Sequence, residues 1–180
     1  MNKRMLAALV SLAGVFVALY LTLYKLGYIG TLVCAVGSCE TVQTSRWASL
    51  LGIPVATWGV AFYIVVLAVS LYGLTDAMAD SRRLSRALVL MTGTGVLFSV
   101  WLTYLELFVI HAICQWCVVS AILVTALFVI SVLDLRDVQA LDDVRMAEAA
   151  ARLRVTGYGR IMRNTSEVSL RAIKSDDKEK

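Results

Sequence analysis

The four cysteines of the chain fall into two close pairs, a pattern typical of thiol–disulfide exchange. The first pair is Cys34-x4-Cys39, and the second is Cys114-x2-Cys117. A Cys-x-x-Cys pair at a helix start is reactive, because unpaired backbone N–H groups there favour the thiolate and lower the pKa of the first thiol. One helical turn brings the second sulfur within bonding distance, so such a pair can cycle between dithiol and disulfide. The spacing therefore predicts a redox relay with all four cysteines as catalytic residues.

Two other interpretations of the cysteines stay open at this point. Two structural disulfides would pin a loop in a non-catalytic membrane protein, such as an assembly factor or a transporter subunit. A tetrahedral zinc site made of four cysteines also has compatible residue types. A bridge between Cys34 and Cys39 closes a short loop and would stabilise little through chain entropy, which favours an exchangeable bond over a structural one. The single histidine argues against a histidine-rich metal site, and we expect no metal.

The composition identifies the elements that must position these cysteines. Of 180 residues, 59% are hydrophobic and 17% are charged, against roughly 45–50% apolar and about 25% charged in soluble domains. A membrane helix needs roughly 20 mainly apolar residues. Continuous apolar runs, without the alternation of barrel strands, indicate an all-α membrane protein, a four-transmembrane-helix bundle. The predicted spans are residues 5–24, 54–74, 87–110 and 113–133.

Basic residues predict the orientation of the bundle, because Lys and Arg near helix ends stay preferentially in the cytoplasm. With both termini cytoplasmic, only Lys25 and Arg46 lie outside. The outer loop 25–53 and the start of the fourth span then carry all four cysteines toward an oxidising compartment. The inside holds Lys3, Arg4, Arg82, Arg83, Arg86 and the ten basic residues from Arg136 onward.

Residues 1–133 are therefore expected to form a transmembrane catalytic domain, followed by a charged cytoplasmic tail, residues 134–180. Ala147 to Arg154 favour a helix within that tail, which we expect to be solvated or associated with lipid headgroups. The sequence has no basic stripe interleaved with aromatic residues, so we expect no binding of nucleic acid.

Oxidation of thiols releases two electrons, and the sequence suggests what accepts them. No Gly-x-Gly-x-x-Gly motif follows a strand, so we expect neither nicotinamide nor flavin. The Cys-x-x-Cys pair lies at the depth of the outer membrane interface, where the ring of a lipid-soluble quinone would reside. The candidate quinone contacts are aromatic residues and a histidine near that depth, with an interfacial aromatic belt as the alternative: Trp58, Tyr104, Phe108, His111 and Trp116.

Two ionisable residues near the Cys-x-x-Cys pair are candidates for proton transfer. Glu106 is the acidic residue within a predicted span, and a charge there is costly unless it faces a polar cavity or a partner. It either helps to carry protons or snorkels to the interface. His111 lies three residues before Cys114, where it either assists the thiol or is a satisfied interfacial side chain.

Several further motifs accompany the cysteine pairs: Cys39-Glu-Thr-Val-Gln-Thr-Ser45-Arg46-Trp47, Gly52-Ile53-Pro54, Trp58-Gly59, Phe62-Tyr63 and Cys114-Gln-Trp-Cys117. Together these motifs resemble bacterial members of the vitamin K epoxide reductase (VKOR) family over about residues 5–133. The resemblance implies a four-helix bundle around a quinone, ubiquinone or menaquinone, with a partly helical outer loop that caps the active site.

Family members of this kind reoxidise a separate periplasmic thioredoxin-fold protein, DsbA-like, that introduces disulfides into secreted proteins. The resemblance therefore implies a bacterial inner membrane protein with its active site toward the periplasm. By position, Cys34 would exchange with the partner, Cys39 would pass electrons to Cys114, and Cys117 would lie against the quinone. Ser45 and Trp47 match a serine near the relay and a tryptophan of the cap.

Two positions depart from the animal enzymes and favour an ordinary respiratory quinone over vitamin K epoxide. Ala121 stands where those enzymes carry a tyrosine, and Val55 where they place an asparagine. Bacterial disulfide bond formation protein B also has four spans and two outer cysteine pairs. Its Cys-x-x-Cys pair comes first in the chain, whereas here it comes second, so the vitamin K epoxide reductase family fits better.

Overall fold

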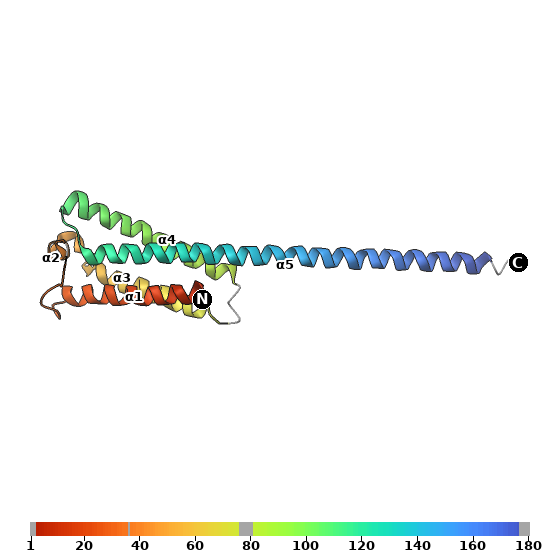
Figure 1. The fold of residues 1–180 in the computed structure, drawn as a ribbon, viewed down its shortest axis with the longest axis horizontal. Helices are drawn as coiled ribbons and strands as arrows, with labels where there is room; N and C mark the ends of the chain where they lie inside the picture. Colours follow the sequence, from red (N-terminus) through yellow and green to blue (C-terminus); the bar gives the residue numbers. More distant parts are fainter. Residues whose placement is uncertain (1–2, 36, 76–80, 177–180) are drawn as a thin grey trace. The chain divides into compact units, whose positions relative to one another are not determined.

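Long apolar runs form the main helices of the chain. The computed structural model describes residues 3–35, 37–75 and 81–176, with side chains through residue 154 (Figure 1). The chain divides into two units, Met1–Val138 and Gln139–Lys180. The long helices are α1 (Lys3–Lys25), α3 (Val55–Tyr72), α4 (Arg82–Leu105) and α5 (Gln115–Asp176).

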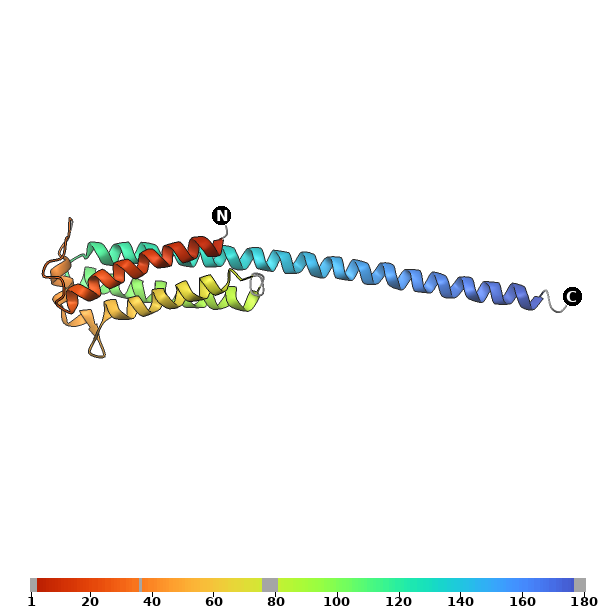
Figure 2. The same cartoon turned by 90° about the horizontal axis from the view of Figure 1, so that it is seen from below.

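Within the first unit, α1, α3, α4 and the beginning of α5 lie side by side and alternate in direction (Figures 1 and 2). In the described part of the chain, four helices are long and apolar enough to cross a membrane. The predicted class, a helical membrane bundle, is therefore confirmed. The helical segments that contain a sufficiently apolar stretch are Lys3–Lys25, Val55–Tyr72, Arg82–Ile110 and Gln115–Arg154.

The helix bounds differ from the predicted spans at two places. The helix α4 begins at Arg82, five residues before the predicted span 87–110. Its first turn is basic and polar, so the hydropathy pattern does not mark it, although it is helical. The helix α5 extends to Asp176, well beyond the predicted end at residue 133. Residues such as Ala, Glu, Arg and Leu after that point have high helix propensity, which continues the helix beyond the apolar run.

Small residues let the helices of the bundle pack closely, as in many membrane proteins. Gly14 on α1 faces Tyr63 on α3, and a Cβ added at Gly14 would lie 2.3 Å from Cε1 of that tyrosine. Tyr63 is buried, and its hydroxyl contacts Ser120 on α5, as donor to the backbone oxygen over 3.0 Å. Many large apolar side chains on the outside of the bundle, such as Leu97, are exposed, as a lipid-facing surface requires.

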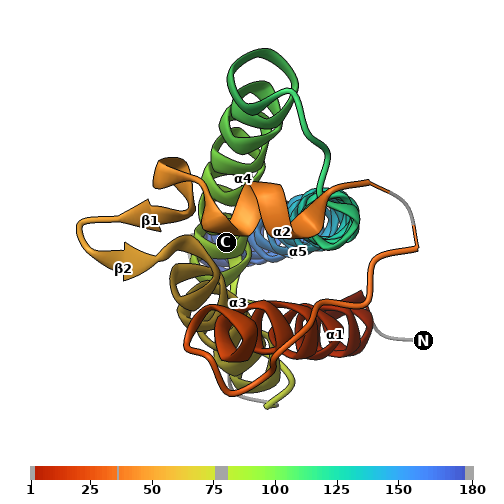
Figure 3. The ribbon, with the colours of Figure 1, turned by 90° about the vertical axis from the view of Figure 1, so that its left-hand side faces the viewer.

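The segment between α1 and α3 folds over one end of the bundle (Figure 3). Its short helix α2 lies across that end, and a two-stranded antiparallel hairpin stands to one side. This is the partly helical outer loop that the fold class predicted. Leu51 and Gly52 form the hairpin turn with positive φ angles of 56° and 80°. The elements are α2 (Cys39–Thr44), the 3₁₀-helix η1 (Arg46–Ala48), β1 (Ser49–Leu50) and β2 (Ile53–Pro54).

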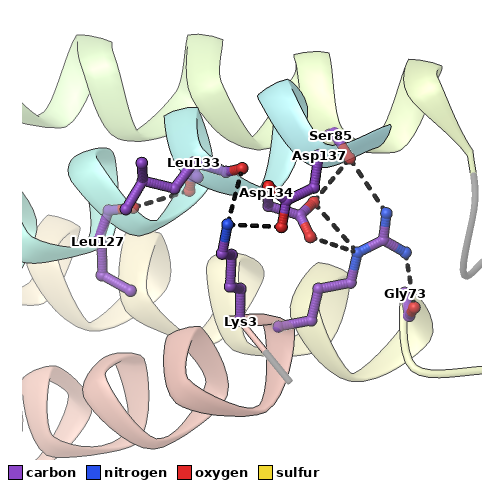
Figure 4. Close-up of polar contacts among 9 residues, drawn as sticks. Lys3, Gly73, Ser85, Leu127, Leu133, Asp134 and Asp137 are labelled. Carbon is purple, nitrogen blue, oxygen red and sulfur yellow. Dashed lines mark hydrogen bonds and ion pairs between the residues drawn. The ribbon is translucent and has the colours of Figure 1, made fainter. Parts of the chain in front are cut away.

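A buried polar cluster joins the helices at the opposite end of the bundle (Figure 4). The guanidinium of Arg4, on α1, donates to the backbone oxygen of Gly73 over 2.6 Å and to Ser85 Oγ over 3.0 Å. Its Nε lies 3.2 Å from Oδ2 of Asp134 on α5, and Ser85 Oγ donates to the same oxygen over 2.7 Å. Each buried charge of the cluster therefore has a partner. The residues of the cluster come from α1, α4 and α5 and from the position directly after α3, so their contacts link all four helices.

Candidate active site

The first cysteine pair lies where the outer loop enters α2. Cys34 and Cys39 form a disulfide with their Cα atoms 6.3 Å apart. Cys39 is the first residue of α2 and is only 1% exposed, whereas Cys34 is half-buried. A protein thiol that approaches from outside can therefore reach Cys34 but not Cys39.

The second pair begins α5, and both of its cysteines are free thiols. Cys114 is fully buried and directly precedes the helix, and the N–H of Val118 donates to its carbonyl oxygen over 3.1 Å. The hydrogen bond from the Cys117 thiol lowers the pKa of Cys114 from 9.0 to about 7, assisted by backbone N–H groups and opposed by burial. Cys114 is thus the thiol of this pair that ionises near neutral pH.

Backbone contacts bring the two pairs together. Gly37 forms an antiparallel bridge with Cys114, and the N–H of Ser38 donates to the carbonyl oxygen of Ile113 over 2.9 Å. The φ of Gly37 is +93°, and a Cβ added there would lie 2.3 Å from that same oxygen. Only glycine fits this close approach. As a result, Cys39 and Cys114 belong to one buried cluster.

Side chains also fasten the Cys34 loop to the start of α5, and we call this set the loop latch: Tyr20, Gln115 and Trp116. Trp116 Nε1 donates to the carbonyl oxygen of Val33 over 3.0 Å, and the N–H of Ala35 donates to Gln115 Oε1 over 3.0 Å. The Tyr20 hydroxyl accepts from the N–H of Val33 over 3.1 Å, and its ring packs on Trp116 with centroids 5.1 Å apart. The latch holds the first disulfide over the second pair.

Glu106 lies next to the second pair and is the first residue of a π-helical turn, η2 (Glu106–Ile110), that ends the third span. Such turns are rare in proteins as a whole, but many of those that occur lie at functional sites. Glu106 is only 5% exposed, and its Oε2 accepts the N–H of Cys114 over 3.1 Å. The Cys117 thiol is a second hydrogen-bonding partner of this carboxylate. Snorkelling to the interface, one of the two predicted alternatives for Glu106, is therefore wrong, because the side chain is buried and accepts the N–H of Cys114.

A cavity of about 550 Å³ opens beside Cys117, between the helices and under α2. Most of its wall is apolar, with contributions from α1, α3, α4 and α5. Its polar groups include Gln43, Ser45, Glu106 and Ser120, in addition to the Cys117 sulfur. An apolar pocket with a few convergent polar groups suits a flat, mostly apolar molecule that carries hydrogen-bonding oxygens.

Of the five predicted quinone contacts, one lines the cavity and four do not. Trp58 lines the cavity, as do Ser45 and Trp47, the two residues assigned to the cap. Tyr104, Phe108 and His111 do not line it: all three are exposed, and the rings of the first two stack on each other with centroids 5.0 Å apart.

The remaining predicted contact, Trp116, belongs to the loop latch and does not line the cavity. The π turn helps to explain why the predicted contacts that follow Leu105 on the third span do not line the cavity, because its additional residue shifts the helical period there. His111, in a left-handed conformation with φ 56°, then ends the turn.

Gln43 is a site residue that the sequence reasoning missed. It is 7% exposed, lines the cavity, and places Nε2 4.0 Å from the Cys117 sulfur. The Lys25 ammonium donates to the backbone oxygen of Gln43 and so ties α1 to α2. The available signal was its spacing: Gln43 follows Cys39 by four residues, which places both side chains on one face of a helix.

Among the residues described, no group of three or more histidine, cysteine or acidic side chains is arranged to hold a metal ion. The family comparison agrees with the cysteine geometry. The model of the vitamin K epoxide reductase family matches residues 5–132, which is most of the chain. The match includes both cysteine pairs, the cap and the four predicted spans, except for residue 133 at the end of the fourth span.

Proposed function

We propose that this chain, which belongs to the vitamin K epoxide reductase family, is a membrane thiol:quinone oxidoreductase that reoxidises a separate thioredoxin-fold, disulfide-introducing protein. One observation carries the proposal. A disulfide, Cys34–Cys39, lies against a free dithiol, Cys114 and Cys117, and that dithiol adjoins an apolar cavity. The two pairs thus connect the outer surface to a space suited to a lipid-soluble acceptor.

The first exchange takes place at Cys34, because it is the more accessible sulfur of its disulfide. A thiolate of the reduced partner attacks Cys34, a mixed disulfide forms, and Cys39 leaves as a thiolate. The second thiol of the partner then attacks the mixed disulfide. The partner departs as a disulfide, and two electrons remain on the loop as the Cys34 and Cys39 thiols.

The second exchange passes these electrons to the pair on α5. Cys39 attacks Cys114 in the oxidised Cys114–Cys117 pair, and Cys117 leaves. Cys34 then attacks Cys39, and Cys114 leaves. A leaving thiol departs faster when its pKa is low, and the pKa of Cys114 is about 7. The products of this exchange are a loop disulfide and a reduced second pair.

The acceptor is a membrane quinone, ubiquinone or menaquinone, which takes up two electrons and two protons. Cys117 presents its sulfur to the cavity, while Trp47 and Trp58 supply flat apolar walls. The carboxylate of Glu106 accepts the proton of the Cys117 thiol as the disulfide with Cys114 re-forms. The contact between Glu106 and Cys117 supports this assignment.

The charge distribution supports an inner-membrane orientation with both termini in the cytoplasm and the cysteines toward the periplasm. Lys3 and Arg4 begin α1 at the end of the bundle opposite α2, and Arg82 and Arg83 begin α4. Positive residues of this kind stay on the cytoplasmic side. On this proposal, residues 1–133 are the catalytic domain and residues 134–180 are a cytoplasmic tail.

Quinol formation tests the function directly. The purified full chain is mixed with a reduced thioredoxin-fold protein and a quinone, and the absorbance change on quinol formation is followed. Wild-type protein should turn over, whereas Cys114→Ala and Cys117→Ala should not. Undiminished turnover in either variant would overturn the relay, and disulfides that resist millimolar reductant in the wild type would indicate a non-catalytic protein with structural bridges.

Trapping tests the assignment of Cys34 as the residue that meets the partner. In Cys39→Ala, the free Cys34 thiol should accumulate a mixed disulfide with the partner on mild oxidation, visible as a larger species on a non-reducing gel. The matched variant, Cys34→Ala, should accumulate much less, because Cys39 is only 1% exposed. Equal trapping by the two variants would contradict the assignment.

A further inference from the structure

The amide of Gln43 occupies an unusual position for a polar group. It lies on the inner side of α2, is 7% exposed, and lines the cavity beside Cys117. The hydrogen-bonding partner of its Nε2 among the described residues is the Cys117 sulfur, 4.0 Å away. Sulfur is a weak acceptor. A buried amide that makes only so weak a bond is costly unless a further acceptor reaches it.

Neighbouring polar groups of the cavity wall are already engaged within the protein. Ser45 Oγ donates to the backbone oxygen of Val42 over 2.7 Å. The Tyr63 hydroxyl contacts Ser120, over 3.0 Å to its backbone oxygen and 2.9 Å to its Oγ. The Gln43 amide therefore keeps N–H capacity at the point where the cavity meets the reactive sulfur.

We infer that the side-chain amide of Gln43 donates a hydrogen bond to a carbonyl oxygen of the acceptor quinone and holds that carbonyl beside Cys117. The inference rests on the proposed function and adds the residue that recognises the acceptor. An amide N–H needs a hydrogen-bond acceptor, and the carbonyl oxygens are the acceptors that a quinone ring offers, so a ring without carbonyls gains nothing from Gln43. The flat apolar part of the ring is bound by the rest of the wall.

The same hydrogen bond assists electron transfer. The thiols of Cys114 and Cys117 lose two electrons and two protons and become a disulfide, while the quinone gains both and becomes a quinol. Negative charge develops on the quinone oxygens during this step, and an N–H donor fixed in a water-poor cavity stabilises it. Gln43 keeps its own protons throughout, and Glu106 takes the proton of the Cys117 thiol and passes it on toward the quinone, so that it is a carboxylate again when the quinol has formed.

Paired ligands test the carbonyl requirement without turnover. The full chain is prepared in detergent with both cysteine pairs oxidised, so that no electrons reach the ligand. Binding of 2-methyl-1,4-naphthoquinone and of 2-methylnaphthalene, which lacks both carbonyls, is then measured by calorimetry. Gln43→Leu removes one hydrogen bond, which contributes about 1 kcal/mol. We therefore expect this variant to bind the quinone about fivefold more weakly than the wild type. Its binding of the hydrocarbon should be unchanged.

Two further variants keep the result interpretable. Gln43→Met has a similar length and no N–H, so it should show the same carbonyl-dependent loss if Gln43→Leu does not fold. Glu40→Gln changes an exposed residue of α2 that does not line the cavity, and it should bind both ligands as the wild type does.

The outcomes separate the two proposals. Equal quinone affinity in the wild type and the Gln43 variants overturns the role of Gln43, and an equal loss of both ligands overturns it as well, since the change would then be one of shape. Failure of the wild type to bind or reduce any quinone overturns the proposed function itself.

Discussion

Trp116 Nε1 donates a hydrogen bond to the carbonyl oxygen of Val33 over 3.0 Å, which ties the start of α5 to the loop that carries Cys34. Trp116→Phe should therefore loosen the latch and slow the exchange between the two cysteine pairs. One hydrogen bond of about 1 kcal/mol corresponds to a roughly fivefold decrease in partner-driven quinol formation. Quinol formation driven by a small dithiol that reduces the second pair directly should change little.

The matched control for the latch is Trp101→Phe. Trp101 lies on α4, is 40% exposed and does not line the cavity, so both rates should stay at the wild-type level. A parallel decrease of the partner-driven and dithiol-driven rates in Trp116→Phe would contradict the latch, because it would place the defect at the second pair or at the acceptor.

Gly37→Ala should separate the two cysteine pairs. The added Cβ would lie 2.3 Å from the carbonyl oxygen of Ile113, and a φ of +93° is unfavourable for alanine. We expect partner-driven turnover to fall at least tenfold, with little change in helix content by circular dichroism. Gly30→Ala, where a new Cβ meets nothing within 4 Å, is the control. Wild-type turnover in Gly37→Ala would show that the close approach is dispensable.

The ionisation of Cys114 should depend on pH in a defined direction. Since its pKa is lowered from 9.0 to about 7, the thiolate should be half-formed near pH 7 and should be lost as the pH falls below that value. The ultraviolet absorbance of the thiolate, with the titration of Cys114→Ser subtracted, measures this. In Cys117→Ala the midpoint should rise, because the thiol that donates the main hydrogen bond is absent. An unchanged midpoint would argue against that cause.

Glu106→Gln should impair the step that follows the exchange between cysteine pairs. The amide oxygen can still accept the N–H of Cys114, but it no longer accepts a proton. General-base catalysis contributes about 10²–10⁴-fold, so quinol formation should fall by about two orders of magnitude. Stopped-flow mixing should show the second pair remaining reduced in the presence of quinone. Accumulation of the oxidised second pair at the wild-type rate would rule out Glu106 as proton acceptor.

Arg4→Leu should destabilise the bundle far from the cysteines. The substitution leaves Asp134 buried without its cation, which costs about 3–5 kcal/mol. Lys3→Leu removes a more exposed ion pair, with Asp137, and costs about 0–1 kcal/mol. Thermal unfolding in detergent should therefore begin at a clearly lower temperature in Arg4→Leu than in Lys3→Leu, with wild-type quinol formation by both below that temperature. Equal unfolding temperatures would contradict a stabilising role for the cluster.

Local patterns in the sequence were sufficient for the helices of the bundle. The runs 5–24 and 54–74 correspond closely to α1 (Lys3–Lys25) and α3 (Val55–Tyr72). The reason is that a membrane helix forms all its backbone hydrogen bonds within itself, so its length follows from hydropathy. The predicted end of the fourth span at residue 133 differs much more from the end of α5 at Asp176. Hydropathy marks where the apolar run stops and not where the helix stops.

The spacing of the cysteines also showed which sulfurs could pair, since each pair is close in the chain. It did not show which sulfur of the first pair is buried. That depends on α2 docking over the bundle, through the bridge between Gly37 and Cys114 and the contact of Lys25 with Gln43. These contacts join residues far apart in the sequence, and no local period encodes them.

The sequence by itself therefore determined the membrane bundle, the two cysteine pairs and the chemical class of the site. Only the tertiary structure decided which side chains surround the reactive sulfur. It turned Trp116 toward the Cys34 loop, left Tyr104 and Phe108 exposed, and directed Glu106 and Gln43 to Cys117. The physical reason is that a π turn and a docked cap helix set side-chain direction through long-range packing, whereas hydropathy and spacing report only what lies within one helix.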